Sequence, residues 1–510
     1  MSVGKWNGSR LWLKTFEPLI VIANVGAKKS TAIAIPNIIK WNGSGIHNDT
    51  ADELYEVTSN ALRSLGYPVY QFRPMSRKTH RFNPFHWCCE MDLADRWGMI
   101  ERICLKIIPE SKGESSKSWS RMARRVLEGL SAYLISTTSY CTLGQLAEIC
   151  CKANFTEWLK KEILENDKAD TQFKVNAIAF INIDAAQTQG GVKFNYEAYI
   201  GLYLNPIIRA ATEYSDFDVT RLRKEKMHIF FGIPDGEISQ LEPLIAMFWE
   251  EISAHLMKKV PNIKKEPYPV LLNIDEFGNS GRLDRIRKTL TSLRKYRVRT
   301  IIYLQYKDQV GQDFTIEEAK AFNSIPNKIL LSATGSIDDA KYFSDLFGQQ
   351  TIRYNTKSRH AMRIDVNTNE NIGKRALMTQ DEFMQIKDND ALLHMAGKHP
   401  IKFKKASYFE DTKLKKLLGE KIDSDTDNNV PTQKPIEPVI DLSMMKKELT
   451  DEEKEIKKLE KEAKEDRKHE QELDKIREMT SMVLDSVERA NNPKNEQEDC
   501  SLDDSIKRDM

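Results

Sequence analysis

Residues 269–278 read Pro269-Val-Leu-Leu-Asn-Ile-Asp-Glu-Phe-Gly278, a short apolar run that ends in two adjacent carboxylates. A run of this length, bounded by Pro and Gly, predicts a buried parallel strand. Open α/β sheets bind their ligands at the carboxyl ends of such strands, so Asp275 and Glu276 are expected at a ligand-binding edge. Taken alone, the dipeptide is explained equally well as a surface pair that follows a core strand.

A second strand is predicted at Val298–Leu304, after a basic segment that begins at Leu293. It ends at Gln305, so an amide is expected at the same sheet edge as the two carboxylates. In ATP-hydrolysing motors, an Asp at this edge binds Mg²⁺, the neighbouring Glu orients the attacking water, and an amide can sense the γ-phosphate. On its own, Gln305 is better explained as a polar residue that closes a strand.

A phosphate-binding loop is predicted near the N-terminus. Pro18-Leu-Ile-Val-Ile22 predicts a strand, and the loop Ala23-Asn-Val-Gly-Ala-Lys-Lys-Ser-Thr31 leads into an apolar segment through Ile39. Strand, loop and helix in this order form the P-loop arrangement, whose pattern is G-x-x-x-x-G-K-[ST]. The lysine neutralises the β- and γ-phosphates and the hydroxyl binds Mg²⁺. The predicted nucleotide-binding residues are Gly26, Lys29, Ser30 and Thr31, and the predicted Mg²⁺ ligands are Ser30 and Asp275.

The loop departs from the pattern at two positions. Ala23 replaces the first Gly, and Lys28 replaces the Gly that precedes the lysine. At the second position a side chain opposes the positive φ or close backbone approach that Gly allows. Without the strand at residues 270–274, an ordinary basic loop would explain this segment better.

The composition is typical of an intracellular machine. A length of 510 residues allows two or three domains, and 40% hydrophobic residues can build a sizeable core. The net charge of +2 gives no global argument for nucleic acid, so any DNA contact must come from local basic patches. The seven cysteines show no C-x-x-C spacing, which favours reduced thiols in the cytosol. No apolar stretch approaches the roughly 18 residues of a membrane helix, so we predict a soluble chain with no transmembrane segment.

Hydrophobic periodicity predicts the domain organisation. From about residue 97 to 200 it is helical, which predicts an all-α insertion; Arg121, Arg124 and Arg125 there favour a solvated face over a DNA contact. Strands and helices alternate on either side, which predicts an α/β fold with a mostly parallel, doubly wound sheet. After residue 416, residues 423–438 predict a linker and residues 444–490 a long charged helix rather than a stable coiled coil. The predicted parts are an N-terminal lead (1–20), an NTPase domain in two pieces (21–96 and 201–415), the all-α domain (97–200), and the linker with its helical tail (416–510).

Several segments then occur in a fixed order along the chain. They are Ala23–Asn37, Asp49 with Glu53-Leu-Tyr55, His80-Arg-Phe-Asn-Pro84, Trp119, Ser215-Asp-Phe-Asp218 with Leu222-Arg223, Asp275-Glu-Phe-Gly-Asn-Ser-Gly281, Arg294-Lys-Tyr296, Gln305, and Ala396-Gly-Lys398 with Pro400. From about Leu19 to Phe409 the chain resembles the soluble part of the type IV secretion coupling proteins of the TraG family. These are hexameric ATPases that present DNA or protein substrates to a secretion channel.

The resemblance implies a RecA-like P-loop NTPase fold and a site for ATP and Mg²⁺. On the matching positions it implies phosphate and Mg²⁺ contacts for Lys29 and Ser30, and metal and water roles for Asp275 and Glu276. It implies that Gln305 senses the γ-phosphate. Arg294 matches the family's trans-acting arginine, which a neighbouring subunit supplies, so a homo-hexamer is also implied.

The resemblance extends to partners and location. The implied partners are a relaxase–DNA complex or protein effectors, single- or double-stranded DNA, and components of the type IV secretion channel. The implied location is peripheral, at the cytoplasmic side of the bacterial inner membrane. Most of the family carries membrane helices ahead of the P-loop, so this chain is expected to be an N-terminally shortened form or to dock through partners.

Two departures from the family bear on activity. Lys28 stands where the family has Gly, and Asp49-Thr-Ala-Asp-Glu53 stands where the family has Asp-x-Lys-Gly-Glu. The strand before this run is expected to be spoiled, because Gly45-Ile-His-Asn48 replaces an apolar segment.

Three functions therefore stay open. The favoured one is a coupling ATPase that hydrolyses ATP at subunit interfaces, because Asp275, Glu276, Arg294 and Gln305 are all retained. The second is a non-hydrolysing adaptor that binds nucleotide weakly and recruits substrates, which Lys28 and Ala51-Asp52 support. The third is a DNA translocase of the FtsK/HerA kind, which would show DNA-stimulated hydrolysis without a secretion partner and against which the Trp119 block argues.

Overall fold

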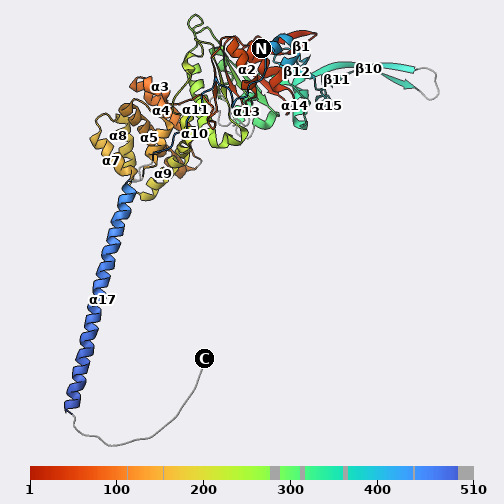
Figure 1. Cartoon of the computed structure of the whole chain (residues 1–510). Coiled ribbons are helices and arrows are strands. Elements are labelled where there is room, and N and C mark those ends of the chain that lie inside the picture. Colours follow the sequence, from red (N-terminus) through yellow and green to blue (C-terminus); the bar gives the residue numbers. More distant parts are fainter. Residues whose placement is uncertain are drawn as a thin grey trace. The chain divides into compact units, whose positions relative to one another are not determined.

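One large β-sheet organises the chain from its N-terminus to about residue 404 (Figure 1). The computed structural model describes residues 1–111, 113–152, 154–275, 288–310, 316–359, 366–439 and 443–491. The chain divides into two compact units, residues 1–440 and 441–510. The sheet and both helical layers belong to the first unit.

The sheet has 11 strands in the order β2-β1-β13-β12-β9-β3-β8-β7-β4-β6-β5. The strands from β9 to β5 in this order run parallel, whereas β12, β13, β1 and β2 run antiparallel to their neighbours. Their bounds are β1 Ser2–Trp6, β2 Ser9–Trp12, β3 Leu19–Ile22, β4 Ser44–Asn48, β5 Val69–Phe72, β6 His228–Phe231, β7 Val270–Ile274, β8 Val298–Leu304, β9 Asn327–Leu330, β12 Asp390–Met395 and β13 Ile401–Lys404. The predicted mostly parallel α/β sheet is confirmed.

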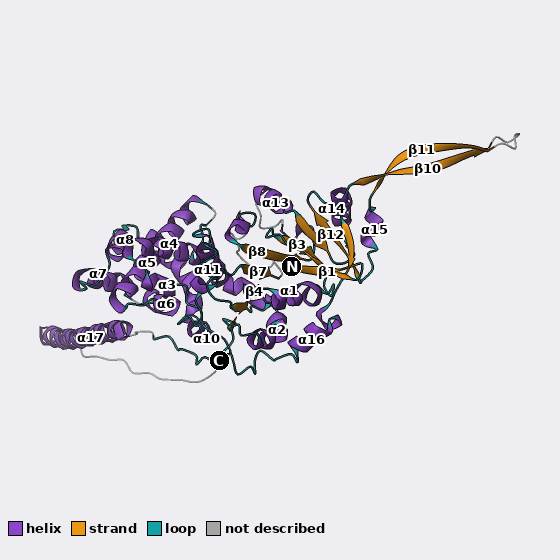
Figure 2. Ribbon diagram, turned by 90° about the horizontal axis from the view of Figure 1, so that it is seen from above, coloured by secondary structure: helices purple, strands orange, loops and turns teal. Residues whose placement is uncertain are grey.

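Helices cover both faces of the sheet because the central strands are apolar on both sides. In β3, Leu19 and Val21 pack into one core and Ile20 and Ile22 into the other, as the two-residue period of a strand requires. The first core also holds α1 (Ile35–Lys40), α2 (Glu53–Ser64) and α16 (Thr412–Leu418). The second core holds α11 (Ile238–Met257) and α14 (Ile337–Phe347). It also holds α13 (Ile316–Asn323), which precedes α14 in the sequence, and α15 (Gln380–Met384), which follows it (Figure 2).

The segment between β5 and β6 is helical, as the periodicity predicts. Its helices are α3 His86–Glu90, α4 Leu93–Ile107, α5 Glu114–Thr138, α6 Leu143–Cys150, α7 Phe155–Glu165, α8 Thr171–Ile181, α9 Ala186–Ile200 and α10 Pro206–Ala211. A capping box at Thr142 and Gln145 starts α6 and satisfies two backbone N–H groups of its first turn. Trp119 on α5 packs so closely over Gly191 on α9 that a Cβ at Gly191 would lie 3.0 Å from the indole.

Two of the segments that carry the family resemblance join the helical block to the sheet. Arg81 and Asp216 form an ion pair with a shortest distance of 2.7 Å, and the rings of Phe82 and Phe217 stack at 5.8 Å. The Asn83 amide donates to the Cys141 carbonyl, which precedes α6, at 2.9 Å. These two segments thus form a structural junction between the helical block and the sheet.

Both ends of the first unit differ from the sequence expectation. The predicted N-terminal lead contributes β1 and β2, and β1 is fixed to α1 because Asn37 donates to the Ser2 carbonyl at 2.8 Å. The predicted linker at residues 423–438 is also wrong, because this segment packs on the sheet domain. Asp427 is buried and accepts hydrogen bonds from Tyr55 at 2.6 Å and Arg63 at 2.9 Å.

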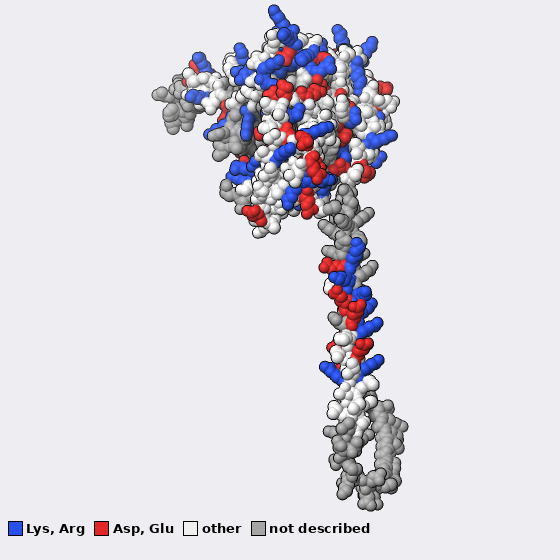
Figure 3. Space-filling model, turned by 90° about the vertical axis from the view of Figure 1, so that its left-hand side faces the viewer, with Lys and Arg blue, Asp and Glu red and all other residues white. Residues whose placement is uncertain are grey.

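Two further elements lie outside the sheet. A two-stranded ribbon, β10 (Gln349–Arg359) and β11 (Val366–Ala376), extends beyond α14 and α15 (Figure 2) and was not expected from the sequence. The second unit holds α17 (Ser443–Asn491), along which acidic and basic side chains are interleaved (Figure 3). Its described apolar side chains, among them Ile456, Leu459 and Ile476, are exposed, as predicted for a solvated helix. Among the residues described, no helix is both long enough and apolar enough to cross a membrane.

The strand predicted to be spoiled, Gly45-Ile-His-Asn48, is in fact the buried central strand β4 between β6 and β7. The buried His47 of this strand has a polar partner in His228. The two rings stack, and His47 Nε2 lies 2.9 Å from His228 Nδ1. Gly45 leaves room for this pair, because a Cβ there would lie 2.5 Å from His47 Nε2. Burial and the neighbouring His228 hold the pKa of His47 well below its ordinary value, and burial lowers the pKa of His228 to about 3.

The histidine pair predicts a stability loss at acid pH. Below about pH 6.5 the unfolded chain binds protons at both positions, whereas in the folded chain burial opposes protonation of both, and of His228 until the pH approaches 3. The free energy of unfolding should be fully retained above pH 6.5 and fall by about 1.4 kcal/mol per histidine for each unit below it. Urea unfolding at pH 6.5 and at pH 5.0 gives the free energy of unfolding at each pH. Between these two pH values, wild type should lose up to about 4 kcal/mol more of this free energy than the double variant His47→Leu/His228→Leu. An equal loss in the two proteins would contradict this account.

Candidate nucleotide-binding site

Neighbouring parallel strands end at one edge of the sheet and bring two predicted site residues together. In the order β3-β8-β7, Ile22 lies opposite Leu304 and Ile302 lies opposite Ile274. The loop after β3 carries Lys29, and β7 leads directly into Asp275. The Lys29 ammonium lies 3.0 Å from Asp275 Oδ1, and the two side chains are 20% and 19% exposed. The residues predicted to bind phosphate and metal are therefore in contact.

The loop between β3 and α1 is fixed by its neighbours. The Ala23 N–H donates to the Leu304 carbonyl at 2.9 Å, and the Asn24 N–H donates to the Ser332 hydroxyl at 3.0 Å. Gly26 has a φ of 77°, in the region that favours glycine. The helix starts as a π-helical turn at Ser30–Ala34, and Pro36 at the start of α1 lacks the N–H of a regular α-helical turn.

Lys28 adopts the backbone conformation for which the pattern has glycine. Its φ is 69°, in the left-handed region that costs an L-residue of order 1–2 kcal/mol. Its ammonium donates to Asn389 Oδ1 at 3.2 Å, toward the segment that precedes β12. The backbone at Lys28 therefore has a conformation that glycine adopts without cost. The consequence of having lysine at this position is backbone strain.

Replacing Lys28 by glycine is expected to relieve this strain and raise ATP turnover. Lys28→Ala is the matched control, because it removes the same side chain but keeps the left-handed cost. Relative to Lys28→Ala, the glycine variant should gain up to about 1 kcal/mol in free energy of unfolding. Steady-state turnover and thermal unfolding of the three proteins measure both effects. Equal turnover in all three would place any impairment elsewhere in the site.

Ser30 and Thr31 follow Lys29 in the first helical turn. Ser30 is half-buried and begins the π-helical turn. The Thr31 hydroxyl lies 3.4 Å from the Lys28 carbonyl and 3.5 Å from the Ser407 hydroxyl. These contacts hold Thr31 against the segment that follows β13, so its nucleotide contact stays a prediction.

The end of β4 carries the second departure from the family pattern. Asp49 is buried and accepts hydrogen bonds from the N–H groups of Leu54 at 3.1 Å and Tyr55 at 2.7 Å, which fixes the start of α2. Burial raises the pKa of Asp49 well above its ordinary value, and the nearby Asp52 and Asp275 add to this effect. Asp52 occupies the family's glycine position with a φ of 56° and pairs with Arg73 at 3.1 Å. As at Lys28, a charged residue takes a left-handed conformation and is held by a partner.

Gln305 lies at the same edge, directly after β8. Its backbone N–H donates to Gln309 Oε1 at 2.7 Å, and its side chain is half-buried. Together with Asn24 and Val25 of the loop and with Thr334–Ser336, it lines a hollow of about 390 Å³. The predicted γ-phosphate sensor and the predicted phosphate loop thus face a common space.

The family model for type IV secretory system conjugative DNA transfer matches residues 2–465. The chain belongs to this family. Its relatives include protein VirD4 of Rhizobium radiobacter, which is 25% identical over 428 residues that cover 82% of this chain and 61% of that protein. Conjugal transfer protein TraG of Escherichia coli is 21% identical over 459 residues, covering 80% of this chain and 70% of TraG. The chain thus spans about three fifths of the length of the VirD4 relative.

Solved structures of the conjugative coupling protein TrwB have the same fold. The unbound form of TrwBΔN70 aligns with a TM-score of 0.61 and 14% identity, covering 85% of this chain and 92% of that one. TrwB in complex with ADP and Mg²⁺ aligns with a TM-score of 0.56 and 15% identity, covering 76% and 85%. The predicted RecA-like P-loop NTPase fold of this conjugative transfer family member is thereby confirmed.

Of the other predicted catalytic residues, Arg294 is not at the Lys29–Asp275 contact. Glu276 lies outside the described residues. Arg294 lies before β8, at the opposite edge of the sheet, and the 7 residues of β8 correspond to roughly 20 Å. Its side chain is 58% exposed and pairs with Glu17 at 2.6 Å. Arg294 therefore does not reach the site of its own chain.

Sequence reasoning missed the residues, late in the chain, that contact and support the loop between β3 and α1. Lys405, which is buried, donates from Nζ to the Ala27 carbonyl at 3.0 Å. Asn389 and Ser407 contact Lys28 and Thr31, as described above. They flank β12 and β13 as single polar residues, and no spacing in the sequence marks them.

Proposed function

We propose that this chain is a coupling ATPase of a type IV secretion or conjugation system. It binds and hydrolyses ATP at interfaces between its own copies, and it recruits a DNA–protein or protein substrate for delivery to the channel. The observation that carries the proposal is the 3.0 Å contact between Lys29 and Asp275 at the carboxyl edge of the sheet. It joins a phosphate-loop lysine to a strand-end carboxylate, which are the two defining elements of this chemistry.

The nucleotide would bind along the loop that follows β3. Lys29 would hold the β- and γ-phosphates, backbone N–H groups around Gly26 would surround them, and Ser30 and Asp275 would hold Mg²⁺. When bound, Mg²⁺ neutralises charge on the phosphate oxygens during transfer. Asp275 would then exchange its contact with Lys29 for one with the metal. The TrwB structure that contains ADP and Mg²⁺ supports this assignment through its similar fold.

The remaining catalytic roles follow the sequence-based assignment. Glu276 would orient the attacking water, and Gln305 would sense the γ-phosphate from the hollow that it shares with Asn24. Arg294 would act on the nucleotide of a neighbouring copy, because it lies at the far edge of its own sheet and is 58% exposed. This arrangement requires a ring, for which we propose a homo-hexamer.

The partners and location follow from the family. We propose a relaxase–DNA complex or protein effectors as substrates, single- or double-stranded DNA as a ligand, and components of the secretion channel as docking partners. A peripheral position at the cytoplasmic side of the bacterial inner membrane would bring these together. The support is the match to the conjugative DNA transfer family and to VirD4 and TraG relatives.

A non-hydrolysing, substrate-recruiting adaptor is the second candidate. Two strained residues favour it, since Lys28 and Asp52 have φ values of 69° and 56° where the family has glycine. The loop is also tied to Asn389 and Lys405, which can restrict its adjustment to a nucleotide. A DNA translocase outside secretion is not favoured, because the family match covers residues 2–465.

Turnover measured against protein concentration separates the first two candidates. We expect specific ATPase activity of the full chain to rise with concentration, with and without single-stranded DNA, because the site is completed only between copies. Glu276→Gln serves as the blank for contaminating activity. Specific activity that never exceeds the blank at any concentration would favour the adaptor.

A further inference from the structure

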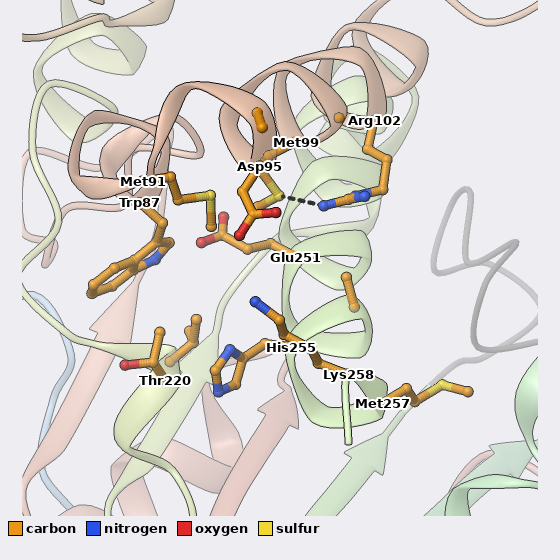
Figure 4. A pocket seen from close by; sticks show the side chains of 14 residues that line it. Trp87, Met91, Asp95, Met99, Arg102, Thr220, Glu251, His255, Met257 and Lys258 are labelled. Carbon is orange, nitrogen blue, oxygen red and sulfur yellow. Dashed lines mark hydrogen bonds between the residues drawn. The ribbon is translucent and has the colours of Figure 1, made fainter.

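A cavity of about 410 Å³ lies between the helical block and the last turns of α11 (Figure 4). Its walls are formed by α3 and α4 on one side and by α11 with Val219 and Thr220 on the other. None of its lining residues belongs to the nucleotide site. Its volume lies within the range of roughly 300–1,000 Å³ that is typical of small-molecule sites.

Glu251 is the residue that gives this cavity a chemical preference. Its side chain is 3% exposed, and neither Oε1 nor Oε2 has a hydrogen-bond partner among the described residues. Figure 4 shows the carboxyl group directed into the cavity, on the same side as Asp95 and Met91. A buried acceptor without a partner costs about 1–3 kcal/mol, so native structures rarely keep one. A ligand with several N–H donors would satisfy both oxygens.

The other walls suit a positively charged group on an apolar body. Trp87 supplies an aromatic ring, whose face attracts cations, and Met91 and Met99 supply thioethers that pack against hydrocarbon; the Met99 sulfur also accepts from Arg102 at 3.3 Å. Lys258, an exposed residue at the end of α11, directs its ammonium into the same space (Figure 4). A primary ammonium on an aliphatic stem therefore fits the cavity sterically.

We propose that this cavity binds a small organic cation, a primary ammonium on a short aromatic or aliphatic body. The ammonium donates to Glu251 and lies near the negative charge of Asp95, and the body packs against Trp87 and the methionines. The Lys258 side chain, which is flexible and exposed, moves outward to water when the ligand enters. No part of this assignment depends on nucleotide hydrolysis.

Proton release accompanies binding. Burial, and to a lesser degree the charge of Asp218, raises the pKa of Glu251 well above its ordinary value, which favours the neutral carboxyl group in the free cavity. An ammonium ligand favours the ionised form and releases the proton to solvent. The charged and titratable groups around Glu251 are Cys88 on α3, Asp95 and Arg102 on α4, Asp218 before the turn at Val219, and His255 and Lys258 on α11.

The test is isothermal titration of the full chain with 2-phenylethylammonium chloride at pH 7. We expect binding at one site with up to one proton released, measured by repeating the titration in phosphate and in Tris. The anionic analogue 3-phenylpropionate and the neutral analogue 2-phenylethanol should bind at least about tenfold more weakly, because a charge-assisted hydrogen bond to Glu251 is lost.

Three variants assign the site. Glu251→Gln should lower the affinity for the ammonium about tenfold or more and abolish proton release. Asp95→Asn, at an exposed position that does not depend on core packing, should lower it by a smaller factor. Lys258→Met should raise it, because a competing ammonium is removed. Tighter binding of 3-phenylpropionate, or an affinity for 2-phenylethylammonium that is unchanged in Glu251→Gln and Asp95→Asn, would overturn the proposal, as would an absence of binding.

Discussion

Replacing Lys29 by alanine is expected to weaken ATP binding by about 100-fold or more and to abolish turnover. Lys29 places its ammonium 3.0 Å from Asp275, so it neutralises a carboxylate that would otherwise repel the phosphates. Both side chains are about one-fifth exposed, and charge-assisted hydrogen bonds are stronger there than at a fully solvated surface. The loss therefore combines the missing phosphate contact with an uncompensated negative charge.

Equilibrium binding of a fluorescent ATP analogue in the presence of Mg²⁺ measures this effect. Lys28→Gly is the matched control, because it removes a lysine charge one residue away in the same loop. That lysine contacts Asn389 and not Asp275, so its loss should leave binding intact or improved. If Lys29→Ala and Lys28→Gly weakened binding equally, the loop would act through its net charge and the assigned contact would be wrong.

Replacing Arg294 by alanine is expected to leave ATP binding unchanged and to lower turnover by about 1,000-fold. The reason is positional. Arg294 lies at the opposite edge of the sheet from Lys29 and Asp275, and its ion-pair partner is the half-buried Glu17. It therefore contributes nothing to binding within its own chain, whereas an arginine supplied by a neighbour stabilises charge that develops only during phosphoryl transfer.

Lys295→Ala is the control for this second prediction. Lys295 lies in the same helical turn, and its ammonium is 5.3 Å from the Tyr296 ring, so the variant removes an adjacent cation without touching Arg294. Turnover in Lys295→Ala should stay close to wild type. A loss of ATP affinity in Arg294→Ala, or equal loss of turnover in both variants, would contradict the role assigned to Arg294.

Apolar strands were predictable from the sequence, whereas buried polar pairs were not. Residues 18–22 are a continuous apolar run, residues 270–274 and 298–304 are mostly apolar, and the structure places the three segments next to one another in the sheet. The run Gly45-Ile-His-Asn48 was misjudged because His47 is stabilised by His228, which lies far away in the sequence. Periodicity reports the polarity of each residue but not the partner that satisfies it.

Two polar segments were mispredicted because their composition does not show how they are held in the structure. The ribbon β10–β11 carries polar and charged residues along both strands, so it lacks the alternation of a strand with one buried face. Residues 423–438 have the composition of a linker, yet Asp427 is buried against Tyr55 and Arg63. A few specific hydrogen bonds hold this segment, and composition does not reveal them.

The candidate site was predictable where its residues follow strand ends. Lys29, Asp275 and Gln305 come together because parallel neighbours in a sheet end at one edge, and that rule applies before any coordinates exist. The φ of Lys28 and the support from Asn389 and Lys405 were not predictable, since they depend on the path of the backbone and on distant segments. Glu251 was missed because a carboxylate within an amphipathic helix is usually assigned to its solvated face.

Mixing the two inactive variants tests most directly whether ATP is hydrolysed between copies of the chain. In the proposed ring, each interface would need Lys29 from one copy and Arg294 from its neighbour, so neither Lys29→Ala nor Arg294→Ala should turn over ATP at an appreciable rate alone. In an equimolar mixture, random assembly gives about a quarter of the interfaces both intact residues, and we predict about that fraction of wild-type turnover. No turnover at any mixing ratio, while Arg294→Ala still binds ATP, would contradict hydrolysis at a shared interface.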